Sequence, residues 1–170
     1  MLTLSGKYCK GVVPHCQHDS QYGVPFSLSA LIQGTSDAMK QYNIHTCIYL
    51  AMEAVRATNK WLTEAEPWKM KGENEHRRIS IVRTAMEAMY VFAHFLAPVM
   101  PSVAHTILTE RLHTPPMNAL SMNTDLYNLV PGTPISQGEI LFTKIEDPNA
   151  TADEANATST SSSDTKTASS

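Results

Sequence analysis

Apolar residues recur every three or four positions in four separate stretches of this chain, and that spacing is typical of helices that bury one face. One stretch begins at Asn43, a residue type that caps helix N-termini, and ends before Pro67, because proline disfavours helical geometry at the preceding residue. Its apolar stripe consists of Ile44, Cys47, Ile48, Ala51, Val55, Thr58 and Leu62. The four stretches predict helices over residues 26–41, 43–65, 74–97 and 102–112.

The segments around these stretches have weaker patterns. Residues 1–9 contain no helix start signal, so no helix is predicted before Gly11. Residues 114–137 are rich in Pro, Asn and Met and read as loop, and residues 138–145 form a short apolar segment, extended or irregular. Residues 148–170 contain no large apolar side chain and are predicted to be a disordered polar tail. Residues 1–147 are thus predicted to form an all-α antiparallel helical bundle.

Composition and charge limit the number of domains and the kinds of partner to expect for this bundle. The 170 residues are 42% hydrophobic and 17% charged, enough for one domain with a modest core. No run of about 18 apolar residues occurs and the N-terminus is polar, so neither a membrane partner nor export is predicted. The chain has a net charge of −3 because residues 146–170 alone carry −4. Residues 56–83, by contrast, carry +3. That window indicates a basic surface or, more commonly, a solvated helical face.

Residue patterns that would support catalysis are lacking. The seven histidines lie outside any recognisable nucleophile motif, and no phosphate-binding glycine loop occurs. Cys9, His15, Cys16 and His18 are close in sequence but lack the C-x2-C spacing of structural zinc sites, which favours ordinary loop residues over a metal site. Three cysteines fit a reducing compartment. No catalytic residue, metal ligand or cofactor is predicted for this chain.

The most distinctive chemistry lies in residues 57–71 (ATNKWLTEAEPWKMK). A predicted helix ends there at Pro67, Trp68 follows at the corner, and Lys69 and Lys71 come directly after it. An aromatic ring beside cations is a platform on which an RNA base stacks while ammonium groups bind phosphate. Packing of Trp68 against a neighbouring helix is an equally good interpretation of the same residues.

Four sequence motifs, taken in the order in which they occur, favour the RNA-binding interpretation of Trp68 over the packing interpretation. They are residues 7–14 (KYCKGVVP), the set Asn59, Trp61, Pro67 and Trp68, residues 95–101 (FLAPVMP) and residues 138–146 (GEILFTKIE). Together they resemble the anticodon-binding domain of class I aminoacyl-tRNA synthetases, and specifically the methionyl-tRNA synthetase family. The resemblance covers residues 7–146.

The resemblance implies a function in translation. The partner would be the anticodon loop of methionine tRNA, with Trp68 stacking on a base of the CAU anticodon and Pro67 shaping the corner. The residues expected to bind tRNA are Arg56, Asn59, Lys60, Pro67, Trp68, Lys69 and Lys71. A family helix before residue 7 is expected to be missing. So is the catalytic domain, which in the family uses ATP with Mg²⁺. The chain is therefore expected to be inactive alone, and its parent cytoplasmic or organellar.

Two other functions compete with this one. A helical protein–protein interaction module could keep the bundle without RNA binding, and a related class I synthetase (isoleucyl, valyl, leucyl or cysteinyl) has a corresponding domain. The Pro67–Trp68 pair favours the methionine family. The segments HCQH (residues 15–18) and KMKG (residues 69–72) faintly resemble the ATP motifs of the catalytic domain. The first lacks its glycine and a preceding strand, and the second lacks its serine, so both are interpreted as coincidence.

Overall fold

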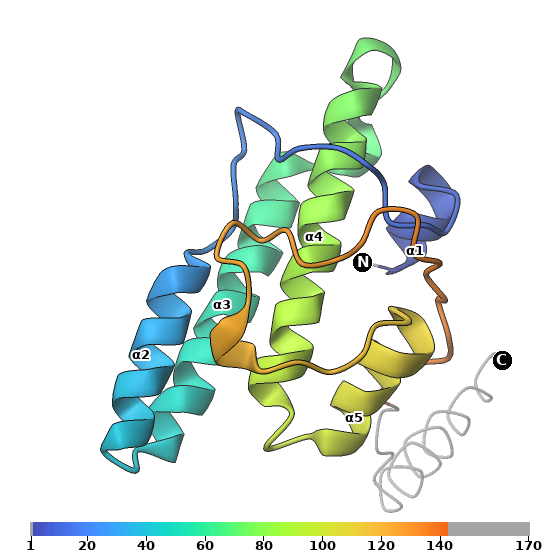
Figure 1. Ribbon diagram of the computed structural model, residues 1–170. Coiled ribbons are helices and arrows are strands. Elements are labelled where there is room, and N and C mark those ends of the chain that lie inside the picture. Colours follow the sequence, from blue (N-terminus) through green and yellow to red (C-terminus); the bar gives the residue numbers. More distant parts are fainter. Residues whose placement is uncertain (1, 143–170) are drawn as a thin grey trace, which may run out of the picture. The chain divides into compact units, whose positions relative to one another are not determined.

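The computed structural model describes residues 2–142 (Figure 1). The predicted tail, residues 148–170, lies outside the described residues, as do the last residues of the segment 138–145. Within the described part the structure consists of helices and turns, and no strand is formed. The α-helices are α1 (Leu2–Tyr8), α2 (Leu28–Lys40), α3 (Ile44–Ala65), α4 (Glu75–Leu96) and α5 (Pro101–His105), and a π-helix, η3 (Thr106–Arg111), extends α5.

Helices α2, α3 and α4 form the antiparallel bundle that the apolar spacing predicts, and short turns join them in sequence (Figure 1). The predicted cap is confirmed, because the Asn43 side-chain oxygen accepts a hydrogen bond of 3.1 Å from the N–H of Thr46. Gly34 lets α2 approach α3 closely: a Cβ atom at this position would lie 2.9 Å from Leu50 Cδ1. All four predicted helices are confirmed, with boundaries shifted by one or two residues and the last divided between α5 and η3.

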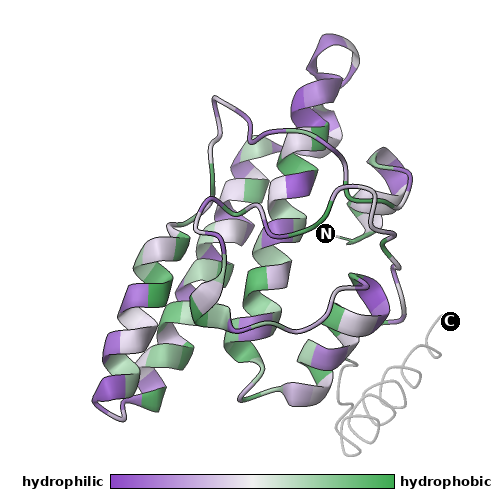
Figure 2. Ribbon diagram, in the orientation of Figure 1, coloured by the Kyte–Doolittle hydropathy of each residue, from purple (hydrophilic) through white to green (hydrophobic). Residues whose placement is uncertain are grey.

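Helix α4 is the central helix. Its residues from Ser80 to Ala88 are all buried, whereas α2 and α3 bury one face each. By length and composition the segment Gly72–Leu96 could cross a membrane, but 78% of its most apolar window is buried inside the protein. Figure 2 shows hydrophobic residues along the helices and a hydrophilic turn where α3 meets α4. Burial in the bundle therefore accounts for the apolar character of α4.

The expectation of no helix before Gly11 is wrong, because Leu2–Tyr8 form helix α1. Seven residues are too few for a helix that is stable alone. Packing stabilises this one: Leu2 is buried at its start, and Cys9 is buried directly after its end, both within the main apolar core. The backbone leaves the helix through Lys10 and Gly11, at φ values of 54° and 69°. Tertiary contacts thus supply what the local sequence lacks.

Two predicted core positions are exposed instead. Met39 and Ile44 lie at the turn between α2 and α3, and their side chains are 53% and 61% exposed. Both continue the apolar spacing of their helices, but the other described segments leave these two side chains more than half exposed. The apolar stripe of α3 instead runs through Ala51, Ala54 and Thr58 toward Trp61.

Two long loops, residues 10–27 and 113–137, run across α4 and pair with each other. The N–H of Val13 donates to the Thr133 carbonyl at 2.9 Å, and the N–H of Gly132 donates to the Val13 carbonyl at 2.8 Å. The N–H of Ile135 donates to the Gly11 carbonyl at 2.7 Å. The pairing is a single antiparallel bridge rather than a sheet.

A buried ion pair on α4 holds both loops. The Arg83 guanidinium donates to the Glu87 carboxylate at 3.0 Å, and both side chains have 0% exposure. Arg83 also donates to the Pro14 carbonyl of the first loop and, at 3.0 Å, to the Leu129 carbonyl of the second. Glu87 accepts from the N–H of Asn128 at 2.8 Å and of Leu129 at 3.0 Å. The pair therefore replaces the hydrogen bonds that a second helix or a sheet would give these loops.

Candidate functional site

The turn that carries Trp68, which we call the Trp68 corner (residues 66–71), is shaped by Pro67. The proline ring disfavours helical geometry at Glu66, which adopts the left-handed conformation at φ 45° and ψ 52°. Its N–H still donates to the Leu62 carbonyl, so α3 ends in a defined cap. Pro67–Lys69 then form a 3₁₀ turn, η1, and the N–H of Met70 donates to the Pro67 carbonyl at 3.3 Å. The corner is thus a regular turn rather than an irregular loop.

The two tryptophans differ in burial. Trp61 is buried at 8% exposure, packs with Ala65, Ile81 and Ala85, and donates its indole N–H to the Tyr22 carbonyl at 2.8 Å. Trp68 is 44% exposed, as its corner position predicts, while Pro67 beneath it is buried. An aromatic ring that is nearly half exposed on an ordered turn is available to stack on a planar partner.

The cations that the sequence assigns to this surface are exposed and weakly paired. Lys69 lies 2.7 Å from Glu66, Lys60 lies 3.9 Å from Glu64, and Arg56 pairs with Glu53. For Lys71 no ion pair is found among residues 2–142. Exposed pairs of this kind contribute about 0–1 kcal/mol. Their cations can therefore exchange a carboxylate for a phosphate at little cost.

The six exposed members of the predicted set come from two neighbouring elements. Arg56, Asn59 and Lys60 lie on the exposed side of the last turns of α3, and the others lie in the corner that follows. All six residues lie at the same end of α3, but they do not line one common pocket.

The three remaining arginines of residues 56–83 pair with carboxylates of the protein itself. Arg77 binds Asp19 at 3.0 Å, Arg78 pairs with Glu75, and Arg83 is fully buried against Glu87. The basic surface is therefore smaller than the net charge of this window indicates.

Sequence reasoning also missed the residues that support the corner from distant segments. Tyr22 accepts the Trp61 indole across 39 positions, and Arg78 reaches from α4 to the Met70 carbonyl at 2.7 Å. The Arg78 guanidinium in turn lies 4.2 Å from the centre of the Tyr8 ring of α1. No local signal marks these residues, because their partners are fixed only when the loops and α1 pack onto α4.

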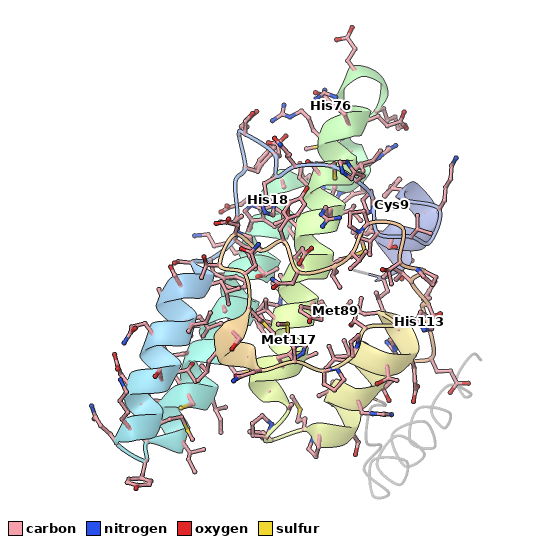
Figure 3. The ribbon with its side chains drawn as sticks, viewed as in Figure 1. Cys9, His18, His76, Met89, His113 and Met117 are labelled. Atoms are coloured by element: carbon pink, nitrogen blue, oxygen red, sulfur yellow. The ribbon has the colours of Figure 1, made fainter. Side chains whose placement is uncertain are left out.

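The cysteines and histidines near the N-terminus are placed apart or in other contacts by the described structure. No three His, Cys, Asp or Glu side chains meet in a metal-binding group anywhere in the described chain. Figure 3 shows Cys9 beside α1 and His18 on the first long loop. Burial raises the pKa of the Cys9 thiol to about 11, which disfavours the thiolate that binds metals. His18 uses both ring nitrogens, with Thr84 and with the Asp125 carbonyl, each at 2.7 Å.

Comparison with known proteins gives a consistent result. Residues 23–161 match the family model described as the anticodon binding domain of methionyl tRNA ligase. The methionine–tRNA ligase of Chlorobium limicola is 31% identical over 146 residues, which is 81% of this chain and 21% of that protein. The enzyme of Flavobacterium psychrophilum is 28% identical over 154 residues, 86% of this chain and 22% of that protein. The chain thus spans about a fifth of the length of these relatives.

Solved structures show the same fold. The apo form of Mycobacterium tuberculosis methionyl-tRNA synthetase aligns with a TM-score of 0.64 at 23% identity, over 86% of this chain and 30% of that one. The same enzyme bound by methionyl-adenylate aligns with a TM-score of 0.62 at 21% identity, over 81% of this chain and 28% of that one. Because the family model matches most of its residues, the chain belongs to the anticodon-binding domain family of methionyl-tRNA ligases.

Proposed function

We propose that this chain binds the anticodon loop of methionine tRNA through the Trp68 corner and so contributes to methionyl-tRNA formation. The observation that carries the proposal is the 44% exposed Trp68 ring on an ordered turn, with Lys69 and Lys71 beside it. An unpaired loop base can stack on the open face of this ring. The lysines would then bind the phosphates on either side, whatever the base.

Family membership supports this assignment over a protein–protein interaction module or another class I synthetase. Within the proposal Trp68 supplies selectivity, whereas Lys69, Lys71, Lys60 and Arg56 supply affinity that depends on salt. Pro67 acts through the backbone that it shapes. Asn59 is exposed on the last turns of α3, where its amide can donate to and accept from a base edge.

The proposed experiment is titration of fluorescently labelled anticodon stem-loops, one with CAU and one with a scrambled loop, onto the 170-residue chain. Trp68→Ala should weaken CAU binding about ten- to a hundredfold, the effect of losing one stacked base. Tyr42→Ala is the matched control, because Tyr42 is 91% exposed at the opposite end of α3. Its affinity for CAU should equal that of the wild type.

Two outcomes would contradict the proposal. Equal affinity of the wild type for both loops would exclude anticodon reading and leave the interaction module as the better hypothesis. Selective binding that survives Trp68→Ala would place recognition elsewhere on the domain.

We further propose that methionine activation belongs to the remainder of the ligase. ATP does not fit the described residues: nucleotide-binding folds hold phosphates at the turn between a strand and a helix, and residues 2–142 form no strand. The purified chain should show no methionine-dependent exchange between ATP and pyrophosphate. If ATP–pyrophosphate exchange activity co-purifies with the chain and persists in preparations free of host ligase, this second proposal is wrong.

A further inference from the structure

Arg78, near the start of α4, connects this helix to the Trp68 corner just before it and to α1, which is distant in sequence. Its side chain is only 10% exposed and pairs with Glu75 in the preceding turn. One guanidinium nitrogen donates to the Met70 carbonyl, two residues after Trp68, at 2.7 Å. The central carbon of the same group lies over the Tyr8 ring of α1, 4.2 Å from the ring centre. The Trp68 corner, α4 and α1 therefore meet at one side chain.

These contacts require an arginine. The planar guanidinium donates from one terminal nitrogen to the Met70 carbonyl and from the other to the Glu75 carboxylate, while its central carbon lies over the Tyr8 ring. A lysine ammonium is a compact point charge without two donor nitrogens held apart in one plane, so it cannot satisfy all three partners in this geometry. The other backbone hydrogen bonds of the corner lie within the turn or reach its chain neighbours Leu62 and Asn74. Its other contacts with the bundle are apolar, through Pro67 and the partly buried Met70 side chain. Apolar contacts hold the turn against α4, but a directional hydrogen bond is needed to set its rotation.

We propose that Arg78 is a positioning residue for tRNA recognition: it fixes the orientation of the Trp68 corner on α4 and ties it to α1. Because its side chain is nearly buried, Arg78 acts through Trp68 rather than by touching RNA. This inference rests on the proposed function of Trp68, and it adds a residue, 10 positions away in sequence, on which that function depends.

The neighbouring residue supplies a matched control. Arg77 also binds a carboxylate, that of Asp19 at 3.0 Å, and also lies over a tyrosine, Tyr22, with 5.5 Å between guanidinium and ring centre. It holds the first long loop, however, and makes no hydrogen bond to the Trp68 corner. Arg77→Met and Arg78→Met therefore remove similar interactions from the same turn of α4, and only one of them reaches the corner.

The test combines binding with a double-mutant cycle. Arg78→Met should reduce the preference for the CAU stem-loop over the scrambled one about tenfold, the size of one charge-assisted hydrogen bond. Arg78→Lys should not restore it, and Arg77→Met should keep it. In a Trp68→Ala background, Arg78→Met should cause no further loss, because a residue that acts through Trp68 has nothing left to orient. All affinities are measured at a temperature where circular dichroism shows each variant folded.

A readout without RNA separates this inference from the proposed function. With fluorotryptophan incorporated, the ¹⁹F resonance of Trp68 is identified by its absence in Trp68→Phe. Arg78→Met should shift or broaden this resonance in the unbound protein, whereas Arg77→Met should leave it unchanged. An unchanged Trp68 resonance in Arg78→Met, additive losses in the cycle, or a reduced salt dependence that signals direct phosphate contact would each overturn the positioning role. Failure of the wild type to discriminate the two loops would instead overturn the proposed function alone.

Discussion

Replacing Arg83 by methionine should be among the most destabilising single changes in this protein. Methionine keeps much of the length of the side chain but removes the guanidinium, which is fully buried and donates to Glu87 and to the Pro14 and Leu129 carbonyls. The Glu87 carboxylate then remains buried without its cation, and one carbonyl of each long loop loses its donor.

The magnitude follows from these lost partners. Breaking a buried ion pair by removing one member costs about 3–5 kcal/mol. We expect the free energy of unfolding to fall by about 4 kcal/mol, because Glu87 keeps the hydrogen bonds from the N–H groups of Asn128 and Leu129. This is a large share of the about 5–15 kcal/mol that stabilises a typical domain. With a urea dependence of about 2 kcal/mol per molar, the unfolding midpoint should fall by about 2 M.

The assay is urea unfolding at pH 8, followed by circular dichroism and tryptophan fluorescence. Lys60→Met is the control, since Lys60 faces Glu64 at 3.9 Å in an exposed pair, and it should change the free energy of unfolding by less than about 1 kcal/mol. Arg83→Met combined with Glu87→Leu should be more stable than the sum of the two single changes predicts, by about 1–3 kcal/mol, because no uncompensated charge remains. A single loss below about 1 kcal/mol, or strict additivity in the double variant, would refute the reasoning.

Three further predictions concern pH, salt and the C-terminal residues. Burial raises the pKa of Glu87 from 4.5 to about 7. Protonation of Glu87 therefore stabilises the folded state fully below pH 4.5, and this contribution is lost as the pH rises through 7. Glu87→Gln should reduce the difference in unfolding free energy between pH 5 and pH 8, measured by urea titration. Lys71→Ala should lower the salt dependence of stem-loop binding by about 0.7 per phosphate contact, whereas Lys40→Ala, on α2, should leave it unchanged. Truncation after Asp147 should leave the thermal midpoint unchanged, since the removed residues contain no large apolar side chain, and a loss of several degrees would show hidden packing.

The sequence by itself determined the three bundle helices and the corner between two of them, because these depend on neighbours in the chain. Apolar spacing placed α2, α3 and α4, Asn43 marked a cap, and Pro67 marked the end of α3 with Trp68 exposed beyond it. Five of the residues predicted to bind tRNA stand at or beside that corner for the same local reason: Lys60, Pro67, Trp68, Lys69 and Lys71. The order of the motifs also indicated the family that the comparison shows.

Only the tertiary structure decided which polar groups reach the surface. Arg83 counts as a surface cation in the sequence, yet two loops cover it and Glu87 neutralises it. Helix α1 has no start signal and forms because Leu2 packs into the core, while Ile44 continues an apolar stripe and is nevertheless 61% exposed. Arg78 meets Tyr8 across 70 positions. Burial and long-range pairing depend on which segments meet in the fold, and helical periodicity carries no information about partners so distant.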